Sequence, residues 1–255
     1  MLVKLAQITD THLFPDRDAT LRGVATWHSL RAVVDRVRQE NPDAIVLSGD
    51  LANDGNPDAY DLLYELIAPL GVPIYWAPGN HDRLDVARDR LDRAPFVTTD
   101  FAELGSWNLI LLDSTFSKAR FGEGELSAAA LARLEIQLDR DRPTAIALHH
   151  HPIPMGIDWV DTIGVTNATD LHALLDRAPN AKLVLFGHTH LEFAGDRDGI
   201  RYYGTPSSCT QVVLSEDKTP ADSPLRLPGF RLLELRDDGT HASKVVRVAD
   251  ALVRS

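Results

Sequence analysis

The sequence predicts an α/β fold in which two packed β-sheets carry helices on their outer faces. Three observations support this prediction. Short apolar runs typical of buried strands alternate with patterns of helical period along the chain up to about Gly195. Beyond that point only strand and turn patterns remain. Polar side chains stand directly after the apolar runs, which is where open α/β sheets place their sites.

The N-terminal part of the chain shows two clear helices between strands. A helix is predicted over residues 26–40 because apolar residues recur at the i, i+3, i+4, i+7 spacing, at Leu30, Val33, Val34 and Val37. Asn56 and Pro57 predict the start of a second helix, since asparagine caps helix N-termini and proline fits the first turn. The apolar side of that helix carries Tyr60, Leu63, Tyr64 and Ile67. Strands at 3–8, 44–47 and 72–76 and a short helix at 83–91 complete this part.

The remaining elements continue the alternation and then change to strands alone. Strands are predicted at 107–112, 144–148 and 182–186. They are separated by a helix capped by Ser127 that runs toward Asp139 and by a helix over 167–177. Short antiparallel strands are then predicted at 201–203, 212–214, 230–235 and 244–248, with turns at Gly199, Gly229 and Asp237-Asp238-Gly239.

Length and composition favour one domain. A chain of 255 residues with 44% hydrophobic composition can bury one sizeable core, and no linker, repeat or low-complexity run divides it. We predict a single domain over 1–255, with the candidate site within about 1–205 and a β-rich part over about 200–250. The first residues enter a strand pattern directly, so neither a signal peptide nor a membrane span is predicted, and the expected location is the cytoplasm. Cys209, the single cysteine, fits a reducing compartment and is interpreted as a small buried hydrophobe.

The net charge of −11 bears on the partners of this chain. A nucleic-acid polymer or an anionic membrane needs a basic footprint, so both are excluded as main partners. A small anionic substrate is still allowed, because bound cations decide the local field more than the global charge does. A homodimer is compatible with this composition.

Residues of metal-ligand type follow five successive predicted strands: Asp10-Thr11-His12, Gly49-Asp50, Gly79-Asn80-His81-Asp82, His149-His150-His151-Pro152 and Gly187-His188-Thr189-His190. This number of carboxylates, imidazoles and amides suits two divalent cations and exceeds what one would use. Residues two apart at a strand end point to the same side, so Asp10 and His12 can chelate one ion. A carboxylate can bridge two cations, which is the role expected of Asp50.

Two clusters leave choices open. Asn80 can ligate one ion through its amide oxygen and donate from its nitrogen to a phosphoryl oxygen, while His81 is a candidate acid that Asp82 could orient. Of the three consecutive histidines at most two face a site, because consecutive side chains alternate. We select His150 as the ligand and place His149 in the outer shell, with His149 as the alternative ligand. The histidines away from the strand ends are interpreted as structural: His28, His172 and His241.

Taken in order, these clusters resemble the calcineurin-like metallophosphoesterase superfamily over residues 1 to about 205. The segments 149–156, 159–161, 167–168 and 205–211 more narrowly resemble the bacterial class III 3',5'-cyclic nucleotide phosphodiesterases of the CpdA group. The resemblance implies a four-layer αββα sandwich. It also implies one metal on Asp10, His12, Asp50 and His190, and a second on Asp50, Asn80, His150 and His188. The family uses iron, manganese or zinc, and mixed nitrogen and oxygen ligation does not select among them.

The resemblance implies hydrolysis of 3',5'-cyclic nucleotides, cyclic AMP first, to nucleoside 5'-monophosphates. A hydroxide bridging the metals attacks phosphorus, with Asp50, Asn80 and His81 as the catalytic residues. Asn80 stabilises phosphoryl charge and His81 protonates the leaving oxygen, and Asn80, His81 and His190 are the expected substrate contacts. Residues 152–166 are a candidate substrate loop in which Met155 or Trp159 touches the base, or else a structural cover, and residues 13–23 are a second candidate wall.

Two other functions stay open at this stage. The same metal chemistry acts on other small phosphoesters, such as glycerophosphodiesters or monoesters, because the ligands act on phosphorus and not on the rest of the substrate. The second alternative is a binding scaffold that keeps the fold without catalysis. The complete set of ligands beside Asn80 and His81 argues against a scaffold.

Overall fold

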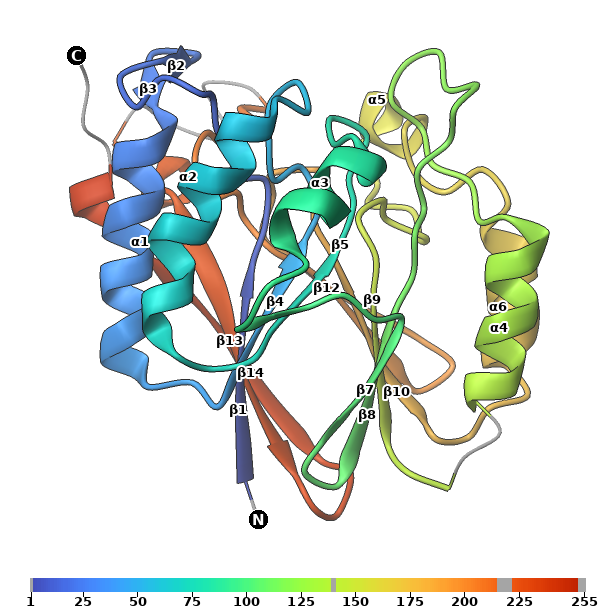
Figure 1. Ribbon diagram of the computed structural model, residues 1–255. Coiled ribbons are helices and arrows are strands. Elements are labelled where there is room, and N and C mark those ends of the chain that lie inside the picture. The colour runs from blue at the N-terminus through green and yellow to red at the C-terminus, as the bar shows by residue number, and fades with distance from the viewer. Residues whose placement is uncertain (1, 139–140, 215–221, 252–255) are drawn as a thin grey trace.

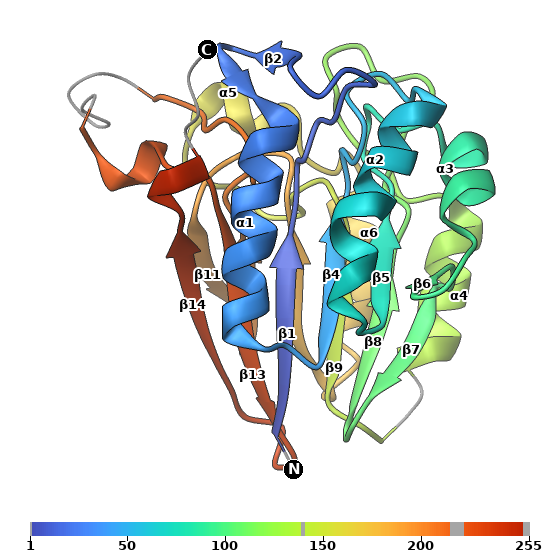
Figure 2. The same cartoon turned by 60° about the vertical axis from the view of Figure 1, so that its left-hand side comes forward.

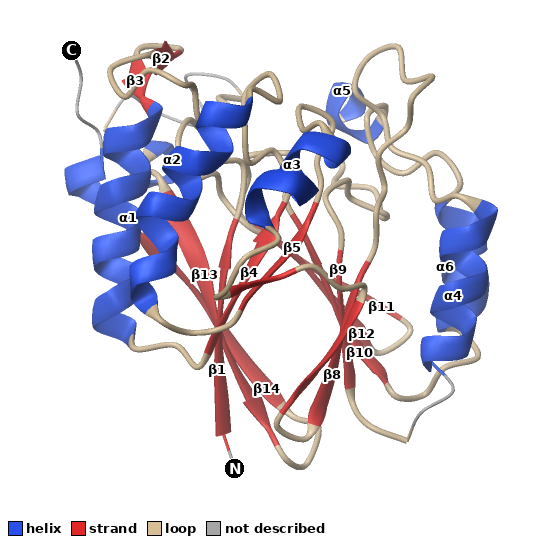
Figure 3. Cartoon of the chain, viewed as in Figure 1, coloured by secondary structure: helices blue, strands red, loops and turns tan. Residues whose placement is uncertain are grey.

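The computed structural model describes residues 2–138, 141–214 and 222–251. Two six-stranded sheets pack face to face, and helices cover the outer face of each (Figures 1 and 3). The predicted four-layer αββα sandwich is therefore confirmed. Within the described residues no helix is long and apolar enough to cross a membrane.

The first sheet has the strand order β14-β13-β1-β4-β5-β6. Its strands are β1 (Leu2–Ile8), β4 (Ala44–Ser48), β5 (Ile74–Ala77), β6 (Phe96–Val97), β13 (Gly229–Arg236) and β14 (His241–Arg247). β1, β4, β5 and β6 run parallel, whereas β13 is antiparallel to β1 and β14 is antiparallel to β13. The outer face is covered by α1 (Thr26–Glu40), α2 (Pro57–Ile67) and α3 (Leu84–Leu91). A short hairpin, β2 (Thr20–Leu21) and β3 (Val24–Ala25), precedes α1.

The second sheet has the strand order β11-β12-β10-β9-β8-β7. Its strands are β7 (Phe101–Leu104), β8 (Trp107–Leu111), β9 (Thr144–Ala147), β10 (Ala181–Phe186), β11 (Phe193–Arg197) and β12 (Ile200–Gly204). β8, β9, β10 and β12 are parallel and the two edge strands are antiparallel. The outer face is covered by α4 (Ala128–Leu138) and α6 (Ala168–Leu175), and a short helix α5 (Asp158–Asp161) lies in the loop before α6.

The strands alternate their side chains between two apolar layers, which explains why the sheets stack. On β10, Leu183 and Leu185 enter the core between the sheets, whereas Val184 and Phe186 pack under the outer helices. This is the period of two expected for strands that are buried on both faces. Such strands give the continuous apolar runs that made them visible in the sequence.

The carboxyl ends of β1, β4, β5, β8, β9 and β10 all reach one end of the sandwich, the upper end in Figures 1 and 2. The loops after these strands carry the residue clusters singled out in the sequence. The fold thus brings together segments that are far apart in the chain, as open α/β sheets do at the ends of their strands.

The helices agree with their sequence predictions to within a few residues. Helix α1 occupies residues 26–40 and buries Leu30, Val33, Val34 and Val37. Asn56 caps α2 by accepting a hydrogen bond from the backbone N–H of Asp58, with Pro57 in the first turn. Ser127 accepts from the N–H of Ala130 at the start of α4, whose predicted end at Asp139 lies outside the described residues.

Two strand predictions in the C-terminal part were wrong. Residues 212–214 form no strand; instead the N–H of Val212 reaches the carbonyl of His190 at 3.5 Å. The strand near residue 201, β12, is not purely antiparallel, because it also lies parallel to β10. The edge strands β7 and β11 were missed because they are short and interrupted by polar residues, so they lack the apolar runs of central strands.

Candidate metal centre

Seven predicted ligand residues and the neighbouring His149 meet at the upper end of the sandwich. Asp10 and His12 follow β1, Asp50 follows β4, and Asn80 follows β5. The second sheet contributes the histidines that follow β9 and β10: His149, His150, His188 and His190. The ligand atoms of these acidic and histidine residues fall into overlapping groups, each with atoms within 4.8 Å of one another. The centre therefore lies on the seam between the two sheets.

The first group consists of Asp10, His12, His190 and Asp50. The Nε2 atoms of His12 and His190 are 3.1 Å apart. The Oδ1 of Asp10 is 3.3 Å from the Nε2 of His190, and the Oδ2 of Asp50 is 3.6 Å from the Nε2 of His12. His190 donates its Nδ1–H to the carbonyl of Thr210 at 2.6 Å, which leaves the Nε2 lone pair facing the group.

The second group is joined to the first through Asp50. Its Oδ2 is 3.3 Å from the Nε2 of His149, and the same nitrogen is 3.2 Å from the Oδ1 of Asn80 and 3.2 Å from the Nδ1 of His188. His149 donates its Nδ1–H to the carbonyl of Ser48 at 2.8 Å, so its Nε2 is free to act as a ligand. Asp50 is thus the carboxylate placed between two clusters of nitrogen and oxygen ligands.

The geometry favours His149 over His150, the reverse of the choice made from sequence. His150 turns its Nδ1 toward the hydroxyl of Ser114 at 2.8 Å, and its Nε2 is buried without a hydrogen-bond partner. Its ring lies beside His149 and His188, and its ligand nitrogen is within 4.8 Å of theirs, whereas His149 makes the short contacts to Asp50 and Asn80. Which of the three consecutive histidines faces the ligand group depends on where β9 ends, and the sequence pattern does not fix that end.

The electrostatics of the groups are those of a site built for cations. Burial opposes ionisation of Asp50, but the neighbouring His149 outweighs it and holds the pKa of Asp50 well below its usual range. Burial likewise disfavours a charged His149, yet Asp50 and Asp10 raise its pKa to about 9. Burial lowers the pKa of His12 to about 4. Protons on histidine balance the buried carboxylates here, and a metal cation would replace those protons.

Backbone conformation sets this centre apart from the rest of the fold. Eight non-glycine residues have a positive φ among the described residues, and five of them are predicted metal ligands: Asp10, His12, Asp50, His188 and His190. A left-handed conformation costs a non-glycine residue of order 1–3 kcal/mol and is kept only where the surroundings enforce it. Such strain in five members of one cluster is typical of a functional site and not of an ordinary loop.

Two glycines let the ligand loops approach closely. A Cβ on Gly79 would lie 2.2 Å from the Oδ1 of Asp50, and one on Gly187 would lie 2.0 Å from the Oγ1 of Thr9 and 2.7 Å from the Oδ2 of Asp10. Real side chains do not reach such distances, so both positions exclude any other residue. The glycines that precede Asn80 and His188 in the sequence are therefore required by space.

The roles predicted for His81 and Asp82 change in the structure. Asp82 does not contact the His81 ring; its carboxylate accepts hydrogen bonds from the backbone N–H groups of Leu51, Ala52 and Gly79 and from the hydroxyl of Tyr60. His81 instead places its Nδ1 2.7 Å from the carbonyl of Asn53, to which it donates. The carbonyl orients the ring, and Asp82 fixes the two loops that carry Asp50 and Asn80.

Replacing Asp82 by asparagine is expected to destabilise the protein and loosen its metals. The partners of Asp82 are all donors, so an amide nitrogen in place of one oxygen leaves a buried N–H group unsatisfied, which costs about 1–3 kcal/mol. Loss of such outer-shell support lowers metal affinity by about 10- to 100-fold. Thermal unfolding and metal titration at pH 8 measure both effects, since burial and the charge of Asp50 raise the pKa of Asp82 to about 6 and the carboxylate is ionised there.

Asp85→Asn is the matched control for this prediction. Asp85 is exposed on α3 and pairs with Arg83 at 3.4 Å, so its replacement should change stability and metal affinity little. Equal effects of the two substitutions would show that Asp82 has no special role.

Residues interpreted as structural lie outside the centre. His28 and His172 sit on α1 and α6, and His241 begins β14, where it contacts Tyr203 and Trp107. Burial raises the pKa of the Cys209 thiol to about 12, as befits a small buried hydrophobe.

Two loops were expected to line the site, one over residues 152–166 and one over residues 13–23. Of the proposed base contacts, Met155 packs against the core under the outer helices, whereas Trp159 on α5 is 52% exposed. The loop over 13–23 is tied to α2 by an ion pair between Arg17 and Glu65 at 2.7 Å. A third loop, between β8 and α4, was not singled out from the sequence although it supplies Ser114 to His150. A run of mixed composition with several serines and two glycines carries no motif that would have identified it.

Comparison with known proteins agrees with this geometry. Residues 3–192 match the family described as Calcineurin-like phosphoesterase. A 3',5'-cyclic-nucleotide phosphodiesterase of Nostoc sp. is 39% identical over 98% of this chain and 94% of its own length. The 3',5'-cyclic adenosine monophosphate phosphodiesterases CpdA of Escherichia coli K12 and Pseudomonas aeruginosa are 40% and 37% identical, over 97% and 98% of this chain and 90% and 92% of theirs.

Solved structures share the fold at low sequence identity. A dimetal phosphatase from Danio rerio superposes with a TM-score of 0.67 at 14% identity, covering 97% of this chain and 99% of its own. GAP50, described as the anchor in the inner membrane complex of Plasmodium, superposes with a TM-score of 0.71 at 14% identity, covering 99% and 87%. A phosphatase and an anchor thus have the same architecture, so the fold alone does not decide between catalysis and scaffolding.

Proposed function

Since this chain belongs to the calcineurin-like phosphoesterase family, we propose that it is a dinuclear-metal phosphodiesterase that hydrolyses 3',5'-cyclic nucleotides, cyclic AMP first, to 5'-monophosphates. The observation that carries this proposal is Asp50, a carboxylate that links two groups of buried nitrogen and oxygen ligands. A single domain over 1–255 fits the proposal, because β13 from the C-terminal part lies beside β1.

We assign the ligands of the two ions as follows. The first is held by Asp10, His12, Asp50 and His190, and the second by Asp50, Asn80, His149 and His188. The second set takes His149 in place of His150, on the strength of its distances to Asp50 and Asn80. Iron, manganese and zinc all suit this mixture of imidazole, carboxylate and amide.

The residues around the metals supply orientation and proton transfer. When bound, the two ions lower the pKa of a water nucleophile and neutralise charge on the phosphoryl group. Asn80 and His81 are exposed at the open side of the centre, where a substrate arrives. Asn80 donates its amide N–H to a phosphoryl oxygen, and His190 borders the same space. The carbonyl of Asn53 holds Nδ1–H of His81, so the other ring nitrogen can deliver a proton to the 3' oxygen as it leaves.

The substrate assignment rests on relatives that match nearly full length and are named as cyclic nucleotide phosphodiesterases. Metal-loaded protein should turn over cyclic AMP faster than 2',3'-cyclic nucleotides, glycerophosphodiesters or phosphomonoesters. A glycerophosphodiester turned over far faster than cyclic AMP would remove the cyclic nucleotide assignment and leave the dinuclear chemistry. A protein that hydrolyses no member of this panel would favour the scaffold.

His149→Ala is expected to lower metal affinity more than His150→Ala does. His149 points its Nε2 at Asp50 and Asn80, so its loss removes a ligand and should exceed the about 10- to 100-fold effect of losing outer-shell support, which is the effect expected for His150. Metal content of purified protein and metal titration by calorimetry separate the two variants. If His150→Ala lost one equivalent of metal and His149→Ala none, the original choice of His150 would be restored.

A further inference from the structure

The loop between β8 and α4 carries a large apolar side chain in an unusual position. Phe121 is 81% exposed, more than any other large hydrophobic residue in the described part of the chain. A phenylalanine ring left in water forgoes the stabilisation that its burial would contribute. Its position requires an explanation other than stability.

Hydrogen bonds fix the turn that presents Phe121. The carboxylate of Glu123 accepts from the backbone N–H groups of Arg120 and Phe121 at 2.9 and 2.8 Å. Further along, the N–H of Gly124 reaches the carbonyl of Gly164, and the N–H of Thr166 reaches the carbonyl of Gly124. The loop is thus joined at its base to the segment before α6, and a turn fixed by hydrogen bonds exposes the ring of Phe121.

This turn lies directly against the metal centre. Gly122 has a φ of +92°, and a Cβ placed on it would be 3.5 Å from the Nδ2 of Asn80 and 3.8 Å from the Cε1 of His188. A Cβ on Gly124 would lie 2.5 Å from the ring of His150. Phe121 is therefore the chain neighbour of Gly122, which lies beside His188 and the exposed Asn80.

We propose that Phe121 is the stacking platform for the nucleobase, a specificity residue that the site analysis did not include. This inference rests on the proposed function, because a phosphodiester bound at Asn80 has its organic group in the space next to the turn. Every base offers a flat π-face to an exposed aromatic ring, and stacking needs no hydrogen-bond partner.

The test separates base binding from catalysis. Inhibition constants of 5'-AMP and of ribose 5-phosphate, which lacks the base, are measured against hydrolysis of bis(p-nitrophenyl) phosphate. In the unaltered protein 5'-AMP should bind more tightly than ribose 5-phosphate. Phe121→Ala should reduce that ratio by about 5- to 150-fold, the range of one base stacked on an aromatic side chain. Phe121→Tyr should retain the ratio, and metal content should not change in either variant.

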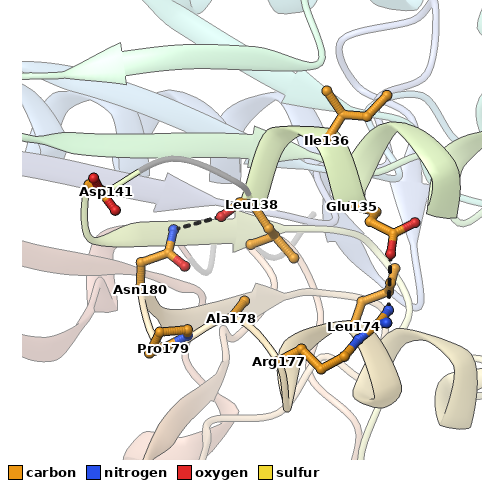
Figure 4. Close-up of a pocket in the computed structure, with 9 residues that line it drawn as sticks. All are labelled: Glu135, Ile136, Leu138, Asp141, Leu174, Arg177, Ala178, Pro179 and Asn180. Atoms are coloured by element: carbon orange, nitrogen blue, oxygen red, sulfur yellow. Dashed lines mark hydrogen bonds and ion pairs between the residues drawn. The ribbon is translucent and has the colours of Figure 1, made fainter.

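A matched control exists at the other end of the molecule. Ile136 on α4 is 72% exposed and borders a surface hollow of about 720 Å³ at the amino-terminal end of β10, away from the metal centre (Figure 4). The hollow contains an ion pair between Glu135 and Arg177, and its described lining shares no residue with the metal centre. Ile136→Ala removes an exposed apolar group of similar kind and should leave the ratio unchanged.

Three results would overturn the inference. Equal binding of 5'-AMP and ribose 5-phosphate by the unaltered protein would show that the base contributes nothing. An unchanged ratio in Phe121→Ala would place the base elsewhere. A ratio lost in Trp159→Ala and kept in Phe121→Ala would assign the platform to α5. Failure to hydrolyse cyclic AMP, with bis(p-nitrophenyl) phosphate still cleaved, counts against the proposed function and leaves this measurement intact.

Discussion

Asp50→Ala is expected to release both metal ions together and to abolish hydrolysis. Asp50 is the carboxylate that faces both groups, with its Oδ2 3.6 Å from His12 and 3.3 Å from His149. Without it, each ion loses an anionic ligand and the charge that holds the partner ion nearby. Metal content should fall from about two equivalents to below one, as expected when a two-metal site loses its bridge. Elemental analysis of desalted protein and activity after metal addition measure this.

The backbone contact of Asp50 calls for a second variant. Its Oδ1 accepts the N–H of His81 at 2.9 Å, so alanine also frees the loop that carries Asn80. Asp50→Asn retains an oxygen acceptor for that bond while removing the charge, and it should still lose metal. Asp85→Ala, an exposed carboxylate on α3, is the control. Active protein that saturates with a single ion would contradict the dinuclear proposal.

His81→Ala is expected to keep both metals and lose rate in proportion to the basicity of the leaving group. A general acid matters when the departing oxygen is a poor leaving group, so kcat with cyclic AMP should fall by about 10²- to 10⁴-fold. Hydrolysis of bis(p-nitrophenyl) phosphate should fall far less, because p-nitrophenolate leaves without a proton. Steady-state kinetics with both substrates, together with metal analysis, give the comparison.

The control for His81 is His28→Ala, a histidine on α1 that pairs with Asp18 away from the centre. An equal loss of His81→Ala activity on both substrates would indicate that His81 positions the substrate and does not transfer a proton. Loss of metal in His81→Ala would instead make it a ligand, since its ring also lies close to His12 and Asp50.

Much of the fold follows from the sequence because its central strands are buried on both faces and its helices on one. For that reason the strands are visible in the sequence as continuous apolar runs, and the helices as a 3.6-residue apolar period. The edge strands β7 and β11 leave no such record, since an exposed edge tolerates Glu103, Gly195 and Asp196. The segment 212–214 shows the converse error, because an apolar triplet can pack without joining a sheet.

The candidate site could be predicted by residue type and position but not by orientation. Strand ends identify where Asp10, Asp50 and His190 must lie, and the structure brings them together. Which of His149 and His150 faces Asp50 depends on a carbonyl of Ser48 and a hydroxyl of Ser114, each distant in sequence. The partner of His81 is a backbone carbonyl, which leaves no trace in residue identity.

The centre lies between the two sheets, and this position also determines when during folding its metal ligands come together. The carboxylate of Asp10 accepts the N–H of His188, 178 positions later, and β1 takes its place between β4 and β13 from opposite parts of the chain. Contacts at such separation form late, because loop closure costs entropy before any contact repays it. As the polypeptide emerges during synthesis, neither group of ligands is complete until β10 and the loop after it have docked on the first sheet. With the proposed ligands, metal capture is therefore expected only after this docking, and a chain that ends before His190 is expected to be inactive.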